Sequence, residues 1–234
     1  SDEAIQVRRF GKFVQRVGLV CNWWDREKNT MLYQSTPHDW SYYEVLDGGF
    51  SDPAAYLFIG VDTDNNVNVI DGFREKGLSD GEIISRRKNI IGSYRIVGGW
   101  IDYSDTRLRD NLATLGMSLE QVDKKTGDSQ RWDEILAEKL AEYGKVERGT
   151  GKPRLFINKH LDWLIQEIEN LTWLEIKRSV GGETQIVPKW DDHRRFGHHF
   201  DGIRALAYFL VSYIKPPHED EPYPEFNIFS KGFY

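Results

Sequence analysis

Three apolar runs in the first third of the chain are separated only by short polar turns. The first, residues 42–46, leads into Asp47 and a Gly-Gly turn, the second spans 54–61, and the third spans 67–70 after a turn rich in Asp and Asn. Short apolar runs bounded by Gly, Pro, Asn and Asp are typical of β-strands. The pattern therefore predicts three antiparallel strands joined by tight turns.

Helical and extended segments alternate after the third run. Ser79 is a predicted N-cap because Glu82 follows at the spacing of a capping box, and Asn158 is the predicted cap of a later helix. Helices are predicted over 79–91, 106–115, 129–143, 159–170 and 198–214. Strands are predicted over 17–24, 94–102, 119–122 and 153–157, and a hairpin with a Gly-Gly turn over 174–187. This alternation indicates an α/β domain.

Composition narrows the class of protein. The chain has 234 residues, 29% of them charged, and a net charge of −6, so a nucleic-acid surface would have to be a local basic patch. Its single cysteine, Cys21, excludes an internal disulfide and a zinc cluster of several thiolates, and is expected to be buried. No apolar run has the length of a membrane span, and no GxxxxGK[ST] phosphate loop is present.

Three separated aspartates are the candidate chemistry. Asp47 and Asp102 each end a predicted strand, and Asp201 lies in the first turn of the last predicted helix. Each alone has an ordinary explanation, because Asp-Gly starts turns and an acid complements a helix N-terminus. Together at one sheet end they would repel one another unless a cation were bound. Oxygen ligands suit Mg²⁺ or Mn²⁺, and two such ions can bind the attacking water and the leaving oxygen of a phosphodiester.

Four segments carry a family resemblance. They are residues 47–54 around Asp-Gly-Gly, 100–104 with Trp-Ile-Asp-Tyr-Ser, 198–204 with His-His-Phe-Asp-Gly-Ile-Arg, and the basic, aromatic stretch 10–20. The first three resemble the acidic motifs of the nuclease domain in large terminase subunits of tailed bacteriophages, members of the RNase H-like or retroviral-integrase superfamily. The fourth is similar to the segment that joins that family's ATPase domain to its nuclease.

The resemblance implies a fold and a domain organisation. The expected fold is an RNase H-like mixed central sheet, with three antiparallel strands followed by parallel strands, flanked by helices and extended by a β-hairpin. Residues 41–215 are expected to form the nuclease. Residues 1–40 are expected to be the tail of an N-terminal ATPase domain packed on the nuclease, and residues 216–234 an extended C-terminal tail.

The resemblance also implies an activity. The expected function is a metal-dependent endonuclease that cuts concatemeric double-stranded viral DNA, with little sequence preference, at initiation and termination of packaging. Two Mg²⁺ or Mn²⁺ ions are the expected cofactors, with Asp47 bridging both and Asp102 and Asp201 each holding one. The implied partners are DNA, the ATPase domain, the portal and the small terminase subunit, in the host cytoplasm and transiently at the procapsid portal, with no membrane.

Other residues are secondary candidates. His198 and His199 are expected either to contact a metal-bound carboxylate or a phosphate, or to be a helix cap and an exposed residue. Asp191 and Asp192 are expected to be loop acids, with one of them as a candidate fourth ligand. Basic residues expected either to contact DNA phosphates or to form solvated faces are Lys124, Lys125, Arg131, Lys177, Arg178, Arg194 and Arg195.

The chain departs from the family pattern at two places. A Glu that often ends the family's third strand is replaced here by Asp71-Gly72, with Asp71 or Glu75 as its candidate substitute. The Tyr that usually follows the Arg of the last helix is replaced by Ala205, and the aromatic residue comes at Tyr208.

Two alternative functions stay open at this point. The same fold can be a docking module for a portal or small terminase subunit with weak or no nuclease activity. It can also belong to a resolvase-like or transposase-like nuclease. A metal titration distinguishes the docking module from the terminase-like nuclease, because a docking module needs no divalent ion to bind its partner. Comparing branched with linear DNA substrates distinguishes the resolvase-like or transposase-like nuclease.

Overall fold

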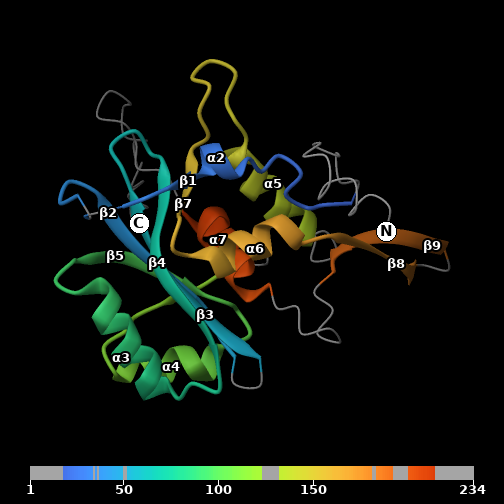
Figure 1. Cartoon of the computed structure of the whole chain (residues 1–234). Helices are drawn as coiled ribbons and strands as arrows, with labels where there is room; N and C mark the ends of the chain where they lie inside the picture. The colour runs from blue at the N-terminus through green and yellow to red at the C-terminus, as the bar shows by residue number, and fades with distance from the viewer. Residues whose placement is uncertain are drawn as a thin grey trace, which may run out of the picture.

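The computed structural model describes residues 18–33, 35, 37–49, 52–122, 132–180, 183–191 and 200–213, with backbone alone over 175–180 and 183–187. A seven-stranded mixed sheet forms the centre, in the order β1-β7-β4-β3-β2-β5-β6 (Figure 1). Its strands are β1 (Thr30–Met31), β2 (Ser41–Asp47), β3 (Pro53–Val61), β4 (Val67–Lys76), β5 (Ile96–Ile101), β6 (Glu120–Gln121) and β7 (Leu155–Asn158).

The strand directions confirm the predicted sheet. β3 is antiparallel to both β2 and β4, whereas β5 runs parallel to β2, β6 parallel to β5, and β7 parallel to β4. The parallel strands β2 and β5 therefore have their carboxyl ends at the same edge. In α/β sheets this edge is where ligands usually bind.

Helices cover both faces of the sheet (Figure 1). α3 (Asp80–Ile91) and α4 (Thr106–Thr114) bury Ile83, Ile84 and Leu112 against one face. α5 (Trp132–Gly144), α6 (Asp162–Asn170) and α7 (Asp201–Ser212) form the core of the other face.

The capping box of α3 is confirmed, because Ser79 Oγ accepts the Glu82 backbone N–H and the Glu82 carboxylate accepts the Ser79 N–H. Asn158 caps no helix; it ends β7, and Leu161 stands at the N-cap position of α6.

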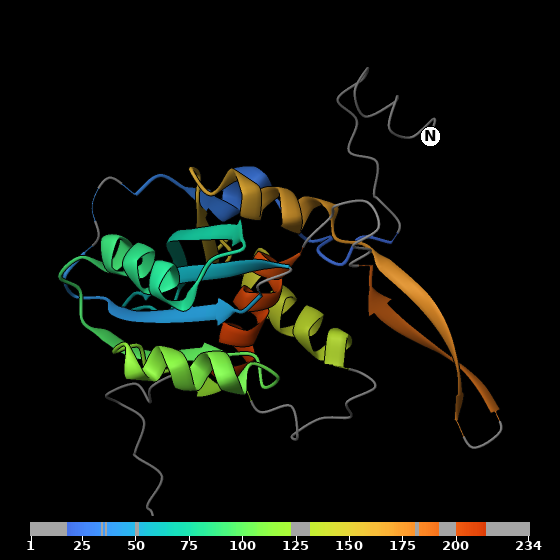
Figure 2. The same cartoon turned by 90° about the horizontal axis from the view of Figure 1, so that it is seen from below.

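The predicted hairpin is present and longer than expected. β8 (Trp173–Val180) and β9 (Glu183–Trp190) form a separate two-stranded sheet. Figure 2 shows this hairpin extending away from the body of the domain.

The segment 18–31 is part of the domain body. Residues 18–23 form turns with one bridge between Leu19 and Thr172, so the strand predicted over 17–24 is wrong. α2 (Arg26–Asn29) follows, and β1 then pairs with β7. A Cβ at Gly144 would lie 1.8 Å from the Trp23 ring, so only glycine fits at this position at the end of α5. The expected link of this segment to an ATPase domain stays a prediction.

Two sequence expectations concern burial and membranes. Cys21 is 2% exposed, as predicted, and burial raises the pKa of its thiol. Among the described residues, no helix combines the length and apolar character needed to cross a membrane.

Candidate active site

Asp47 and Asp102 lie next to each other at one edge of the sheet. Leu46 and Ile101 are register partners on the parallel strands β2 and β5, so Asp47, the last residue of β2, and Asp102, the residue after β5, lie at the same level. Leu46 and Ile101 belong to the core on the α3 and α4 face. Because side chains alternate between faces along a strand, Asp47 and Asp102 project to the opposite face, toward α7.

Helix α7 brings Asp201 to this edge. Burial raises the pKa of the Asp47 carboxyl well above its usual range; the Arg204 guanidinium opposes this shift, and the charges of Asp201, Asp102 and Asp105 add to it. Like charges shift a pKa in this way when they are near one another. The charges of Asp102, Asp201 and Asp105 thus all act on Asp47, and we call Asp47, Asp102, Asp201 and Asp105 the acidic cluster.

Ser104 and Tyr208 hold Asp102 through hydrogen bonds. Its side chain is buried, and its Oδ1 accepts the Ser104 backbone N–H at 2.7 Å and the Ser104 hydroxyl at 2.8 Å. The Tyr208 hydroxyl donates to Oδ2. Burial and the charges of Asp47 and Asp102 raise the pKa of Tyr208, which keeps the phenol protonated as a donor. Tyr208 lies seven residues after Asp201, two helical turns along one face of α7.

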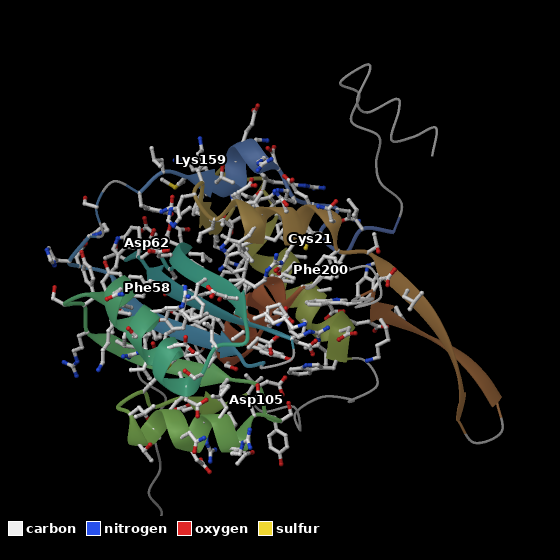
Figure 3. The ribbon with its side chains drawn as sticks, turned by 60° about the horizontal axis from the view of Figure 1, so that its bottom comes forward. Cys21, Phe58, Asp62, Asp105, Lys159 and Phe200 are labelled. Carbon is white, nitrogen blue, oxygen red and sulfur yellow. The ribbon has the colours of Figure 1, made fainter. Side chains whose placement is uncertain are left out.

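Asp105 is a site residue that the sequence reasoning missed. It stands at the N-cap position of α4, where Figure 3 labels it, and its Oδ2 accepts the Gly48 N–H at 3.2 Å. A Cβ at Gly48 would lie 2.7 Å from that oxygen and 2.5 Å from Leu108. Gly48 thus permits the close approach of the β2 turn to α4. The available signal was spacing, because Asp105 follows Asp102 by three residues.

Arg204 links the acidic cluster to the base of the hairpin. Its guanidinium lies 4.9 Å from the Trp190 ring centroid, and its Nη1 is 3.4 Å from Asp133 Oδ1. Asp133 on α5 is buried and also accepts the Trp190 backbone N–H at 3.0 Å. The motif 198–204 contained this arginine, but only the fold shows that its charge acts on Asp47.

The donor chemistry of the cluster suits a hard divalent cation, because carboxylate oxygens are the ligands that Mg²⁺ and Mn²⁺ prefer. Within the described ranges, however, no set of three or more His, Cys, Asp and Glu side chains forms a group that could hold a metal ion. Both oxygens of Asp102 already accept hydrogen bonds. The residues therefore fit a metal in chemical type, and binding one requires their side chains to rearrange.

The substitutes suggested for the family's Glu lie elsewhere. Asp71 is the register partner of Phe58, in the interior of the sheet, and its Oδ1 is 3.1 Å from His160 Nε2. Glu75 forms an ion pair at 2.9 Å with Arg86 of α3, on the face opposite α7. Neither residue replaces the missing Glu at the acidic cluster.

Several secondary candidates lie beyond what the structure describes. Lys177 and Arg178 are on β8, whose backbone alone is described there. Asp191 directly follows β9 and donates its backbone N–H to Thr172 O at 2.8 Å. Those outside the described residues are Lys124, Lys125, Arg131, Asp192, Arg194, Arg195, His198 and His199.

Replacing Tyr208 with Phe tests the support of Asp102. The change leaves a buried carboxylate oxygen without its phenolic donor, so the free energy of unfolding should fall by about 1–3 kcal/mol in urea denaturation. Tyr103→Phe is the control, because Tyr103 is 49% exposed and its loss should stay within about 0.5 kcal/mol. Equal stability of the two variants would contradict a role for Tyr208 in holding Asp102.

Solved structures that share this fold include large terminases of bacteriophages. No protein-family model matches the sequence, and no curated protein matches it. A large terminase from a thermophilic bacteriophage is similar with a TM-score of 0.60 at 16% identity, over 89% of this chain and 49% of that one. The P22 large terminase nuclease domain gives 0.61 at 13% identity, over 85% of this chain and 94% of that domain.

A third similar structure contains a metal. The large terminase nuclease of the thermophilic phage G20c with bound magnesium gives a TM-score of 0.53 at 15% identity, over 85% of this chain and 99% of that one. The present chain spans about half the length of the first of these three terminases. At these identities the likeness shows a shared fold.

Proposed function

We propose, from the fold that this chain shares with the nuclease domains of large terminases, that it is a metal-dependent endonuclease acting on double-stranded DNA. The observation that carries the proposal is the acidic cluster: Asp47 and Asp102 leave parallel strands at one edge, and the charge of Asp201 reaches Asp47 from α7. Three carboxylates brought together at an α/β sheet edge favour a cation-dependent reaction.

Each residue has a proposed role. Asp47, Asp102 and Asp201 would together hold two Mg²⁺ or Mn²⁺ ions. Bound divalent ions of this kind lower the pKa of water and neutralise charge on a phosphodiester. Arg204 favours the ionised form of Asp47. Ser104 and Tyr208 orient Asp102, and the glycine at position 48 brings the β2 turn close to Asp105.

The biological setting is part of the proposal. The domain would cut concatemeric viral DNA when packaging starts and ends, beside an ATPase domain, the portal and the small terminase subunit in the host cytoplasm. His198 and His199 would contact a carboxylate or phosphate near Asp201. The basic residues at 124, 125, 131, 177, 178, 194 and 195 would contact DNA phosphates. Such contacts make binding weaken with salt and carry little sequence preference.

Supercoiled-plasmid cleavage tests the activity. We expect nicked and linear products with Mg²⁺ or Mn²⁺ and none with EDTA, because the proposed reaction needs a bound divalent ion to lower the pKa of water. Linear duplex should be cut at least as well as a four-way junction, whereas preference for the junction would favour a resolvase.

A docking module is the second candidate, and a specific observation favours it. No group of metal-binding side chains is preformed among the described residues, and Asp102 is fully engaged by Ser104 and Tyr208. This reading predicts no plasmid cleavage with any metal, together with binding to a portal or small terminase subunit that EDTA leaves unchanged.

A further inference from the structure

A buried carboxylate on α6 accepts a hydrogen bond from the first turn of α7. Glu167 is 3% exposed, and its Oε2 accepts the backbone N–H of Ile203 at 2.8 Å. The first N–H groups of a helix have no acceptor within the helix. Phe200 occupies the N-cap position of α7 and makes no side-chain cap hydrogen bond. Glu167 therefore supplies, from another helix, a cap that the sequence of α7 lacks.

Arg74 fixes Glu167 in this position. Arg74 Nη1 lies 2.5 Å from Glu167 Oε1, and its guanidinium is 5.6 Å from the Trp163 ring centroid. Arg74 comes from β4 and Trp163 from α6. A buried carboxylate is costly unless a cation and hydrogen bonds accompany it, and Arg74 and the Ile203 N–H meet that need.

The contact between α6 and α7 leaves no space for adjustment. A Cβ at Gly202 would lie 2.3 Å from the Trp163 ring and 3.0 Å from Glu167 Oε2. Gly202 stands between Asp201 and Ile203, so the backbone on both sides of it is set by α6. We call Arg74, Trp163 and Glu167 the α7 brace.

The brace acts next to the acidic cluster. Asp201 is the first residue of α7, and it stands two residues before Ile203, whose backbone N–H donates to Glu167. Burial raises the pKa of Glu167 to about 7, the Ile203 N–H and Arg74 oppose the shift, and the charge of Asp201 adds to it. The Glu167 carboxylate lies at the first turn of α7, and Asp201 is the residue that begins this helix. Each repels the other, so a purely structural cap would be better placed away from Asp201.

We propose that Glu167, held by Arg74, is a positioning residue that sets the start of α7 so that Asp201 meets Asp47 and Asp102. Its benefit to metal binding rests on the proposed nuclease function. In this role Glu167 acts through the backbone of Ile203, whose N–H it accepts.

Hydrogen exchange and metal response together test this role. In Glu167→Ala, the Ile203 amide should exchange at least about tenfold faster than in the parent, because its acceptor is gone. The rise in melting temperature caused by Mn²⁺ should shrink, since Asp201 is no longer held. Glu167→Gln keeps an oxygen acceptor for Ile203 and should restore both measurements in part. Arg74→Met, which leaves Glu167 in place without its cation, replaces Glu167→Ala if that variant does not fold.

Glu169→Gln is the matched control. It lies on the same helix, two residues on, and its carboxylate accepts the Trp24 indole N–H at 3.3 Å on another side of α6. It should leave Ile203 exchange and the Mn²⁺ response at the parent values. Unchanged Ile203 exchange in Glu167→Ala, or an unchanged Mn²⁺ response despite faster exchange, overturns the positioning role. A parent without any Mn²⁺ response instead overturns the proposed function, and with it the purpose of the brace.

Discussion

Asp102→Asn is expected to lower the rate of Mn²⁺-dependent plasmid cleavage by more than about 100-fold, because changes to groups that only support a metal ligand already cost 10–100-fold. The substitution preserves the shape of the side chain and its oxygen acceptor for Ser104. Its amide nitrogen takes the place of Oδ2 and can donate to the Tyr208 hydroxyl, which now donates to Oδ2, and one negative charge is removed. That charge raises the pKa of Asp47, so its removal relieves repulsion within the cluster. Stability in urea should therefore stay equal to that of the parent or rise.

This combination separates a chemical role from a structural one. A residue that only supports the fold would lose activity and stability together. Asp71→Asn is the matched control, since Asp71 is an aspartate of the same sheet that contacts His160 away from the cluster; its cleavage rate should equal that of the parent. If Asp102→Asn cuts DNA at the parent rate, the nuclease site is not at this cluster.

Arg87→Met is expected to cause the largest loss of stability. Arg87 Nε and Nη2 donate to the two oxygens of Glu44 at 2.6 and 2.9 Å, and the Tyr56 hydroxyl donates to the same carboxylate at 2.9 Å. Glu44 is 1% exposed. Removing the guanidinium leaves a buried charge without its cation, which costs about 3–5 kcal/mol in the free energy of unfolding. Urea denaturation measures this loss.

The neighbouring residue provides the control. Arg86 forms an ion pair with Glu75 in which both side chains are more than 40% exposed, and such pairs contribute about 0–1 kcal/mol. Arg86→Met should therefore cost far less than Arg87→Met. Adding Glu44→Gln to Arg87→Met should recover part of the loss, because the neutral amide still accepts the Tyr56 hydroxyl. Equal losses for the two single arginine variants would refute the buried pair as a major source of stability.

The sequence determined the local elements and the candidate acids. The antiparallel strands, the capping box at Ser79, and the hairpin were predictable because apolar runs, caps and turn residues act over a few neighbouring positions. The two aspartates at strand ends, Asp47 and Asp102, could be singled out for the same reason. The register that places Asp47 and Asp102 at the same level could be derived only once β2 and β5 were known to be parallel neighbours.

The tertiary structure alone decided which side chains support the acids. Tyr208 reaches Asp102 across 106 residues of sequence, and Glu167 reaches the Ile203 amide across 36. Neither contact has a local pattern, because each depends on how one helix packs against its neighbours. Asn158 is a case in which a local pattern gave the wrong prediction. Its residue type favours a helix cap, yet pairing with β1 makes it the end of β7. Local hydrogen bonding is encoded by adjacent residues, whereas these distant contacts exist only after the apolar faces of the helices have been buried.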